Sequence, residues 1–458
     1  PLLTYLAVPF IKIFGLTETG IRMVNFPFVL LFPVIIFLFT QELFNKKNIS
    51  LLAAFLSAFA PGLQLLGRQA HEGYLTVFFL TLTAYFFLRL IKKQSILNFS
   101  FFIFHFSLSL FGYHFSRLWA GFYFLLFLFF TFKQKLSKLT VLIFIVVIFL
   151  FGITDFIYKP TRIQNLLFFN NIGFSLKINE LRGEGGSRLV YNKLTVGTKD
   201  LLFEYLRYFS PQFLSINGDE NVRFGFPSVS PITILEYLFI FIGLYYLFKN
   251  KEKWRYLILL MLLLSPVSAA LSWAGESITR SIFIFIPISI IVAYGVINFV
   301  NKKYIFYLFL VPCFLFFSFY SWDFYLNHYP KRAVVLRSWQ AGYKELSNYI
   351  KTNYNRFDKF YITKKNGQPY IYLLFYLNYP PEIYQKESVL SSADQYGFGQ
   401  VEKFDKFIFD INNRKDLKNS AIIGFPDDFL DIEKPYLKEI KIGTEIIFYI
   451  KESATTIL

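Results

Sequence analysis

The sequence predicts an α-helical polytopic membrane protein that ends in a small extracytoplasmic α/β domain. The 458 residues are 55% hydrophobic and only 17% charged, with a mean hydropathy of +0.45. Apolar stretches long enough to cross a bilayer core of about 30 Å follow one another up to Trp322. Basic residues gather in every second connection between these stretches, which is typical of a protein oriented in a membrane.

Composition and charge exclude several other classes of protein. So apolar a chain is neither a soluble enzyme nor a disordered segment. A single cysteine, Cys313, lies in an apolar run, so an internal disulfide is excluded. The 47 Lys and Arg against 30 Asp and Glu give a net charge of +17. Most of the cations flank apolar segments, where they orient a membrane protein, so we predict no nucleic-acid partner.

About ten membrane spans are expected from the apolar stretches. A spanning helix needs roughly 20 mostly apolar residues. The expected spans are 24–44, 50–66, 73–90, 96–113, 118–132, 139–158, 232–248, 254–271, 278–300 and 304–322. Residues 2–16 are apolar but short, so we predict an interfacial or re-entrant helix there.

The charges of the connections orient these spans. Five connections on one face carry the basic residues Lys46, Lys47, Arg89, Lys92, Lys93, Lys133, Lys135, Lys138, Lys249, Lys251, Lys253, Arg255, Lys302 and Lys303. The three short connections on the other face contain only three Lys or Arg residues, namely Arg68, Arg117 and Arg280. The positive-inside rule places the five basic loops in the cytoplasm, and we expect the cytoplasmic (inner) membrane. The large loop 159–231 and everything after Trp322 are then outside. Pro1 is outside as well, which requires one or more further helices upstream.

The chain is expected to divide into a membrane domain, 1–322, and an extracytoplasmic domain, 323–458. The second part has no run long enough to span. Residues 336–354 have helical spacing, whereas 359–363, 407–411, 421–425 and 445–450 are rich in β-branched and aromatic residues and predict strands. Asn366-Gly367 and Pro426-Asp427 indicate turns.

Ionisable residues at the outer ends of the spans form the candidate site. Charges at a membrane boundary are costly, and these have no role in orientation. They are Arg22, Arg68, His71, Glu72, His114, Arg117, Asp219, Arg223 and Arg280. If the bundle closes, they converge on one outward-facing cavity. Arginines hold a phosphate through parallel charge-assisted hydrogen bonds, and a nearby carboxylate could orient a metal, a sugar hydroxyl or an acceptor. A lipid-borne phosphate suits both the charge and the depth.

Each of these residues also has a purely structural interpretation. Arg22 and Arg68 could reach lipid headgroups. Glu72 could pair with Arg68, and Arg280 with Glu276, each four residues apart on a helix. His71 and His114 could have no role other than to cap helix ends or to pair with a carboxylate. Asp219 could lie in a solvated turn. No phosphate-binding glycine loop, zinc spacing or Ser/His/Asp order occurs, so no cofactor is predicted with certainty and a divalent metal remains open.

The outer-face motifs carry a family resemblance. Phe14-Gly-Leu-Thr-Glu-Thr-Gly-Ile-Arg22 is similar to an "FG-x-x-E-x-x-x-R" pattern, and Gly67-Arg-Gln-Ala-His-Glu72 to "SR-x-x-x-E/D". Thr279-Arg-Ser281 is similar to "H-x-x-RS", with Ser277 in place of the usual histidine. The remaining matching segments are Pro1-Leu-Leu-Thr-Tyr5, Phe209-Ser-Pro, Gly218-Asp-Glu-Asn-Val-Arg223 and Gly367-Gln-Pro-Tyr370. In this order the motifs resemble the polyprenyl-phosphate-dependent glycosyltransferases of the GT-C fold, family 39. These are relatives of protein O-mannosyltransferases and of the aminoarabinose transferase that acts on lipid A.

The resemblance implies a GT-C-like bundle and a glycosyltransferase, transferring a hexose or pentose with inversion. The donor is a sugar on a polyprenyl phosphate, and the acceptor is a lipid, a protein or a glycan. The family's catalytic aspartate lies before the proline motif, so we expect it upstream of Pro1.

Within this chain, Glu72 and His71 are the catalytic candidates and are assigned to the acceptor or sugar side. Binding of the phosphate or headgroup is assigned to Arg22, Arg68, Arg117 and Arg280. Further binding residues are His114, Asp219 and Arg223, and Tyr370 is expected to shape the acceptor cleft.

Two other functions remain as alternatives. A transporter or flippase of lipid-linked glycans would also have many spans, but its ionisable residues would lie at the membrane midplane. A glycan polymerase or ligase would also have a large outer loop. Loop 159–231 contains 9 basic and 6 acidic residues but no histidine, which disfavours that function.

Overall fold

The computed structural model describes residues 2–133, 136–158, 168–225, 229–272, 275–300, 306–365, 367–392, 399–412, 419–430 and 437–453. It divides the chain into two compact units, Pro1–Leu326 and Asn327–Leu458. The division falls after Leu326, whereas the sequence suggested a boundary after Trp322. Lys135, Lys302, Lys303 and Asn366, used in the predictions above, lie outside the described residues.

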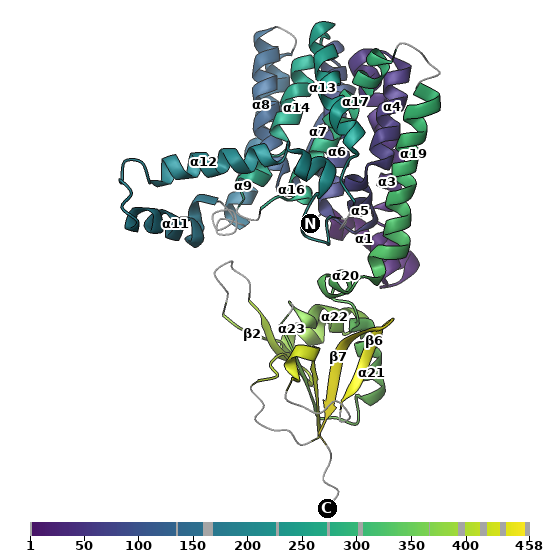
Figure 1. Cartoon of the computed structure of the whole chain (residues 1–458), viewed down its shortest axis with the longest axis vertical. Helices are drawn as coiled ribbons and strands as arrows, with labels where there is room; N and C mark the ends of the chain where they lie inside the picture. The colour runs from purple at the N-terminus through teal and green to yellow at the C-terminus, as the bar shows by residue number, and fades with distance from the viewer. Residues whose placement is uncertain are drawn as a thin grey trace, which may run out of the picture. The chain divides into compact units, whose positions relative to one another are not determined.

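The first unit is a bundle of helices whose long members run side by side (Figure 1). Its principal helices are α1 (Leu2–Phe14), α2 (Glu18–Arg22), α3 (Phe26–Phe44), α4 (Lys47–Phe59), α5 (Pro61–Arg68), α6 (Glu72–Lys92), α7 (Ile96–Leu110), α8 (Ser116–Phe132), α9 (Lys138–Tyr158), α11 (Ile172–Gly183), α12 (Lys193–Arg207), α13 (Ile234–Lys249), α14 (Arg255–Leu264), α15 (Val267–Ala270), α16 (Ile278–Ser281), α17 (Phe285–Phe299) and α19 (Val311–Asp323). In the centre, α3 packs on α4 and α6, α6 packs on α7, and α17 packs on α4 and α13. The predicted α-helical polytopic fold is confirmed.

Each predicted span coincides with one helix or with consecutive helices. Four helical segments of the described chain are long and apolar enough to cross a membrane, namely Glu18–Phe44, Glu72–Lys92, Ile278–Phe299 and Leu308–Lys331. A fifth is obtained if Lys47–Phe59 and Pro61–Arg68, bent by 57°, form one span. The bend follows from Pro61, because proline holds the preceding Ala60 in an extended conformation. Several remaining helices are apolar but shorter, so the number ten stays a prediction.

The two ends of the bundle carry different loops. At one end, Lys46 forms an ion pair of 3.1 Å with Glu252, and Lys92 forms one of 2.8 Å with Glu42. These are connections that the sequence assigns to the cytoplasm. Helix α6 runs from Glu72 to Lys92, so the loop with Arg68 and His71 lies at the opposite end. The candidate residues of the outer connections therefore share the second end, which we call the site end.

The large loop contains a helical arm, whereas the sequence analysis predicted only an outer loop there. Helices α11 and α12 extend sideways from the site end of the bundle (Figure 1). They enclose a small core of Phe168, Phe174, Ile178 and Val196. Both helices begin at asparagine caps, Asn171 and Asn192, which accept backbone N–H groups and explain where the helices start.

The second unit is an α/β domain with a seven-stranded sheet of order β2-β3-β4-β1-β5-β7-β6. The strands are β1 (Lys359–Ile362), β2 (Val389–Leu390), β3 (Val401–Phe404), β4 (Phe407–Ile408), β5 (Ser420–Gly424), β6 (Lys438–Ile442) and β7 (Glu445–Glu452), and the helices are α20 (Ala333–Ser338), α21 (Tyr343–Asn353), α22 (Pro369–Tyr376) and α23 (Pro381–Glu387). Strand β1 is parallel to β4 and β5, whereas the other pairs are antiparallel.

The predicted helix 336–354 is broken into α20 and α21. Gln340 and Gly342 between them have φ of +53° and +91°, which end one helix before the next begins. The four predicted strands are present, and β2, β3 and β6 were not foreseen. At Pro426-Asp427 the chain forms the short helical turn Pro426–Asp428.

Candidate active site at one end of the bundle

The segment between α5 and α6 holds three distant parts of the chain together. The side-chain amide of the buried Asn25 donates to the carbonyl of Gln69 at 2.5 Å. The Gln69 amide in turn donates to the carbonyl of Arg223 at 2.7 Å. The start of α3, the segment before α6 and the large loop therefore meet at this point. Gln69 lies at a variable position of the motif Gly67-Arg-Gln-Ala-His-Glu72, so the sequence did not single it out as a candidate residue.

His71 caps the start of α6 as a neutral ring. Its Nδ1 accepts the backbone N–H of Gly73 at 3.0 Å, so the ring proton lies on Nε2. Burial lowers the pKa of His71 to about 4. The ring centroid lies 5.6 Å from those of Tyr113 and Phe224, which come from the second outer connection and the large loop. His71 thus offers a hydrogen-bond donor, and it carries no positive charge near pH 7.

Glu72 and Arg68 do not form the ion pair that their spacing allowed. Within the described chain, the Glu72 carboxylate has no hydrogen-bond or ion-pair partner, and it lies at the first turn of α6, where the helix dipole favours an anion. The Arg68 guanidinium lies over the rings of Tyr325 and Trp322, with Cζ 4.8 Å and 5.7 Å from their centroids. Stacking leaves its N–H groups in the ring plane available to a phosphate.

Asp219 is a buried carboxylate that ties the large loop to the start of α16. One oxygen accepts the N–H of Ile278 at 2.8 Å, and the other accepts the N–H of Asn221 at 2.9 Å. Burial raises the pKa of Asp219 to about 6, although these two hydrogen bonds and the charge of Arg280 oppose the rise. A solvated turn is therefore the wrong description of Asp219, whose side chain is only 7% exposed.

Arg280 is close enough to Asp219 to act on its charge, and it is not paired with Glu276. The Arg280 guanidinium donates to the hydroxyl of Ser272. Glu276 instead forms two hydrogen-bonded contacts with Arg207 of α12, of 2.8 Å and 2.9 Å. Arg207 of the large loop therefore pairs with the Glu276 carboxylate in place of Arg280. This is a tertiary contact, and a four-residue spacing on one helix cannot reveal it.

Tyr208 is a residue of this end that the sequence did not single out. Its hydroxyl accepts the N–H of Ser277 at 2.9 Å and donates to the carbonyl of Gly275 at 3.1 Å. The only signal in the sequence is its position directly before the Phe209-Ser-Pro motif.

The other predicted residues have separate surroundings. Arg22 is exposed at the end of α2. His114 lies beside Tyr113, with ring centroids 4.2 Å apart, and Arg117 lies 5.9 Å from the ring of Phe151. Tyr370 belongs to the second unit, where it stacks on Tyr384. The contacts described above link the segments that carry His71, Asp219, Arg223 and Arg280. Arg68 and Arg117 lie beside different aromatic side chains.

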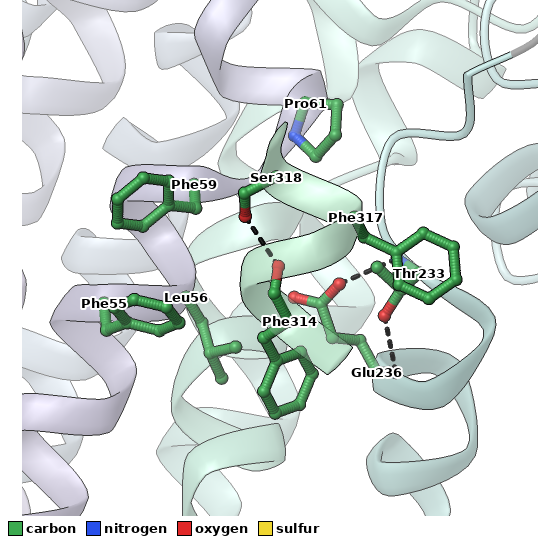
Figure 2. A pocket seen from close by; sticks show the side chains of 9 residues that line it. All are labelled: Phe55, Leu56, Phe59, Pro61, Thr233, Glu236, Phe314, Phe317 and Ser318. Atoms are coloured by element: carbon green, nitrogen blue, oxygen red, sulfur yellow. Dashed lines mark hydrogen bonds between the residues drawn. The ribbon is translucent and has the colours of Figure 1, made fainter. Parts of the chain in front are cut away.

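Among the described residues of the first unit, neither of two small pockets is lined by a predicted arginine. The first lies at the bend between α4 and α5, beside Pro61 (Figure 2). Its buried carboxylate, Glu236, caps α13 by accepting the N–H of Thr233 at 2.7 Å. The second pocket adjoins the surroundings of Asp219, since Gly218, Gly225 and Ile278 line it. In the part of the chain that the structure describes, no three His, Cys, Asp or Glu side chains are grouped to hold a metal ion.

Comparison with known proteins identifies the fold. The family described as dolichyl-phosphate-mannose-protein mannosyltransferase matches residues 1–154. The crystal structure of ArnT from Cupriavidus metallidurans in the apo state matches 98% of this chain and 87% of its own, at 10% identity and a TM-score of 0.53. The same enzyme bound to undecaprenyl phosphate matches 99% and 88%, at 11% identity and a TM-score of 0.53. The chain has the GT-C glycosyltransferase fold.

Another solved structure matches less completely. An archaeal oligosaccharyltransferase, AglB from Archaeoglobus fulgidus, matches 82% of this chain at 16% identity and a TM-score of 0.44. This chain spans 55% of that protein's length. No curated protein matches the chain. The predicted GT-C fold is confirmed, and the match to ArnT covers the second unit as well as the bundle.

Proposed function

We propose that this protein transfers a sugar from a polyprenyl-phosphate donor to an extracytoplasmic acceptor, with inversion at the sugar carbon. The observation that carries the proposal is the GT-C fold along 98% of the chain. The match of residues 1–154 to a mannosyltransferase family supports it. The proposed location is the cytoplasmic membrane, with the site end facing outward. The acceptor is a lipid, a protein or a glycan.

Arg280 is the proposed cation for the leaving phosphate. Transfer breaks the bond between the sugar carbon and the phosphate oxygen, and negative charge accumulates on that oxygen. A guanidinium fixed beforehand stabilises this charge without reorganisation. Ser272 accepts from Arg280, and the buried Asp219 fixes the start of the helix that carries Arg280. Asp219 is therefore a positioning residue in this proposal.

The remaining assigned residues contribute contacts around this centre. Arg68 is held by its aromatic neighbours in an orientation that exposes its N–H groups, so it suits a lipid phosphate. The neutral His71 donates from Nε2, and Glu72 can accept from a sugar or acceptor hydroxyl. Arg22, His114, Arg117 and Arg223 are proposed to surround the headgroup. Tyr370 is proposed to contact the acceptor.

Sugar release from a labelled polyprenyl-phosphate sugar, by protein produced from its complete gene, tests this function. Arg280→Gln should lower kcat/KM by about 100-fold, the typical effect of removing one donor to a developing oxyanion. Arg89→Gln, the same change at the opposite end of the bundle, is the control and should leave the rate unchanged. A wild-type protein that moves the lipid between leaflets without releasing sugar would be a transporter. An undiminished rate in Arg280→Gln would remove that residue from the site.

A further inference from the structure

The helical arm of α11 and α12 is fixed to the ends of membrane spans. The Arg207 side chain contacts Glu276 at 2.8 Å, and the Tyr208 hydroxyl contacts both Gly275 and Ser277. At the other root of the arm, the N–H of Phe168 donates to the carbonyl of Leu271 at 3.0 Å. Both roots therefore lie where α15 ends and α16 begins, at the site end of the bundle.

The arm leaves the bundle sideways. Helix α12 runs at a wide angle to the long helices (Figure 1). Its 15 residues extend about 22 Å at 1.5 Å per residue. Because its root lies at the end of a predicted span and its axis runs across the spans, the tip stays level with the site end of the bundle.

The tip of the arm is well ordered by its own hydrogen bonds. The guanidinium of Arg182 donates to the carbonyl of Tyr191 at 2.7 Å, and Asn192 accepts from Leu194 and Thr195. Lys177 of α11 forms an ion pair of 2.6 Å with Asp200 of α12. The side chains at the tip are therefore presented by a braced hairpin.

Large apolar side chains are nevertheless exposed on this hairpin. Leu189 and Leu194 at the tip are 87% and 76% exposed, and Val190 between them is 57% exposed. Leu202, Phe203 and Leu206 continue the exposed apolar surface along α12. Arg188 and Lys193 are next to the tip leucines in the chain and are exposed too. Leucines flanked by basic side chains are typical of segments that lie in a membrane interface with anionic headgroups.

We propose that the tip, residues 187–194, inserts into the outer leaflet of the membrane. Leu189, Val190 and Leu194 enter the boundary between headgroups and acyl chains, and Arg188 and Lys193 bind lipid phosphates. The arm contacts Glu276, Gly275 and Ser277, and the following residue, Ile278, is held by Asp219. Anchoring the tip therefore fixes the depth of the segment that carries Arg280.

Fluorescence quenching in lipid nanodiscs tests the insertion. Leu189→Cys in a Cys313→Ser background carries a thiol-linked fluorophore. Asp427→Cys in the same background is the water-exposed control, since this side chain is 71% exposed in the second unit. The native Cys313, exposed on the predicted span of α19, is the lipid control. The probe at position 189 should be quenched by nitroxide-labelled lipids at least twofold more than the probe at 427, and it should be protected from iodide.

Two results would overturn the proposal. Iodide quenching at 189 equal to that at 427 would place the tip in water. Protection from both quenchers would mean that protein, such as the second unit or a second copy, covers it. Anionic lipids should increase quenching by nitroxide lipids at 189. Adding Arg188→Gln and Lys193→Gln should abolish this dependence without changing the thermal midpoint, and an unchanged dependence would contradict the assigned phosphate contacts.

Discussion

Burial shifts the pKa values of two ionisable side chains of the site end, His71 and Asp219, in opposite directions. The pKa of His71 falls from 6.5 to about 4, so its neutral form is favoured in the folded state. It stabilises the fold fully above pH 6.5, and this stabilisation is lost as the pH falls toward 4. The pKa of Asp219 rises from 3.8 to about 6, so its charged form is disfavoured, and stability falls as the pH rises through that range.

These contributions oppose each other over nearly the same pH window, so the wild-type stability should depend only weakly on pH between 4 and 6.5. Each amounts to about 3 kcal/mol at 1.36 kcal/mol per pKa unit. Asp219→Asn should unmask a stability that rises with pH. His71→Phe, which keeps an aromatic ring against Phe224, should unmask one that falls. Thermal unfolding midpoints across this range check the prediction, and parallel profiles for both variants would contradict it.

The Asp219→Asn variant should also lose stability near pH 4, where the wild-type carboxyl in the folded state is already protonated and the substitution removes no buried charge. An amide can replace only one of the two acceptor oxygens, and its NH2 group would face a backbone N–H donor. A loss of about 1 to 3 kcal/mol is expected, as for a buried hydrogen bond left unmade. Glu220→Gln, one residue away and exposed, is the matched control. Equal midpoints for the two variants would show that the contact with Ile278 contributes nothing.

At the scale of elements, glycines allow α13 and α17 to approach closely. A Cβ atom on Gly243 would lie 2.1 Å from the carbonyl oxygen of Ile291, and one on Gly295 would lie 2.7 Å from the backbone nitrogen of Gly243. Gly243→Ala should therefore force the helices apart and destabilise the unit by about 1 to 3 kcal/mol. Gly121→Ala in α8 meets nothing within 4 Å and should be neutral or stabilising. Denaturation of both variants in detergent measures the difference, and equal stabilities would argue against this packing.

Sequence patterns predicted elements well where the environment is uniform along them. In the part of the chain that the structure describes, the expected spans are mainly helical, because a bilayer demands internally bonded apolar segments. Strands β1 and β5 were foreseen because they lie in the middle of the sheet and are mostly apolar and buried. Strand β6, an edge strand of sequence Lys-Glu-Ile-Lys-Ile, is mostly polar, and β2 has only two exposed residues, so neither gave a strand signal.

The candidate site was predictable as a set of helix ends but not as a set of contacts. The motifs placed His71, Asp219 and Arg280 at one end of the bundle, where the structure has them. They could not show that Asp219 accepts from Ile278, 59 residues away, because that contact depends on tertiary folding. Likewise, the ion pair between Glu276 and Arg207 depends on the position of the arm, and no spacing of residues along the sequence specifies that position.

For the whole molecule, two separate cores predict two folding units. Leu346, Phe360, Phe407 and Phe448 of the second unit are fully buried within that unit. Residues 327–458 expressed alone should therefore fold and unfold cooperatively, as followed by circular dichroism. Phe360→Ala should destabilise this domain by about 3 to 5 kcal/mol. An isolated segment without a cooperative transition would show that the second unit depends on the bundle.

The central claim is that a polyprenyl phosphate binds at the site end of the bundle. Photo-crosslinking tests it most directly, with a polyprenyl phosphate that carries a photoreactive group beside the phosphate and with protein produced from its complete gene. Mass spectrometry of the adducts should find them in residues 66–72 and 275–281, and Arg280→Gln should reduce their yield. Adducts confined to the loops around Lys46 and Lys92, at the opposite end, would contradict the account.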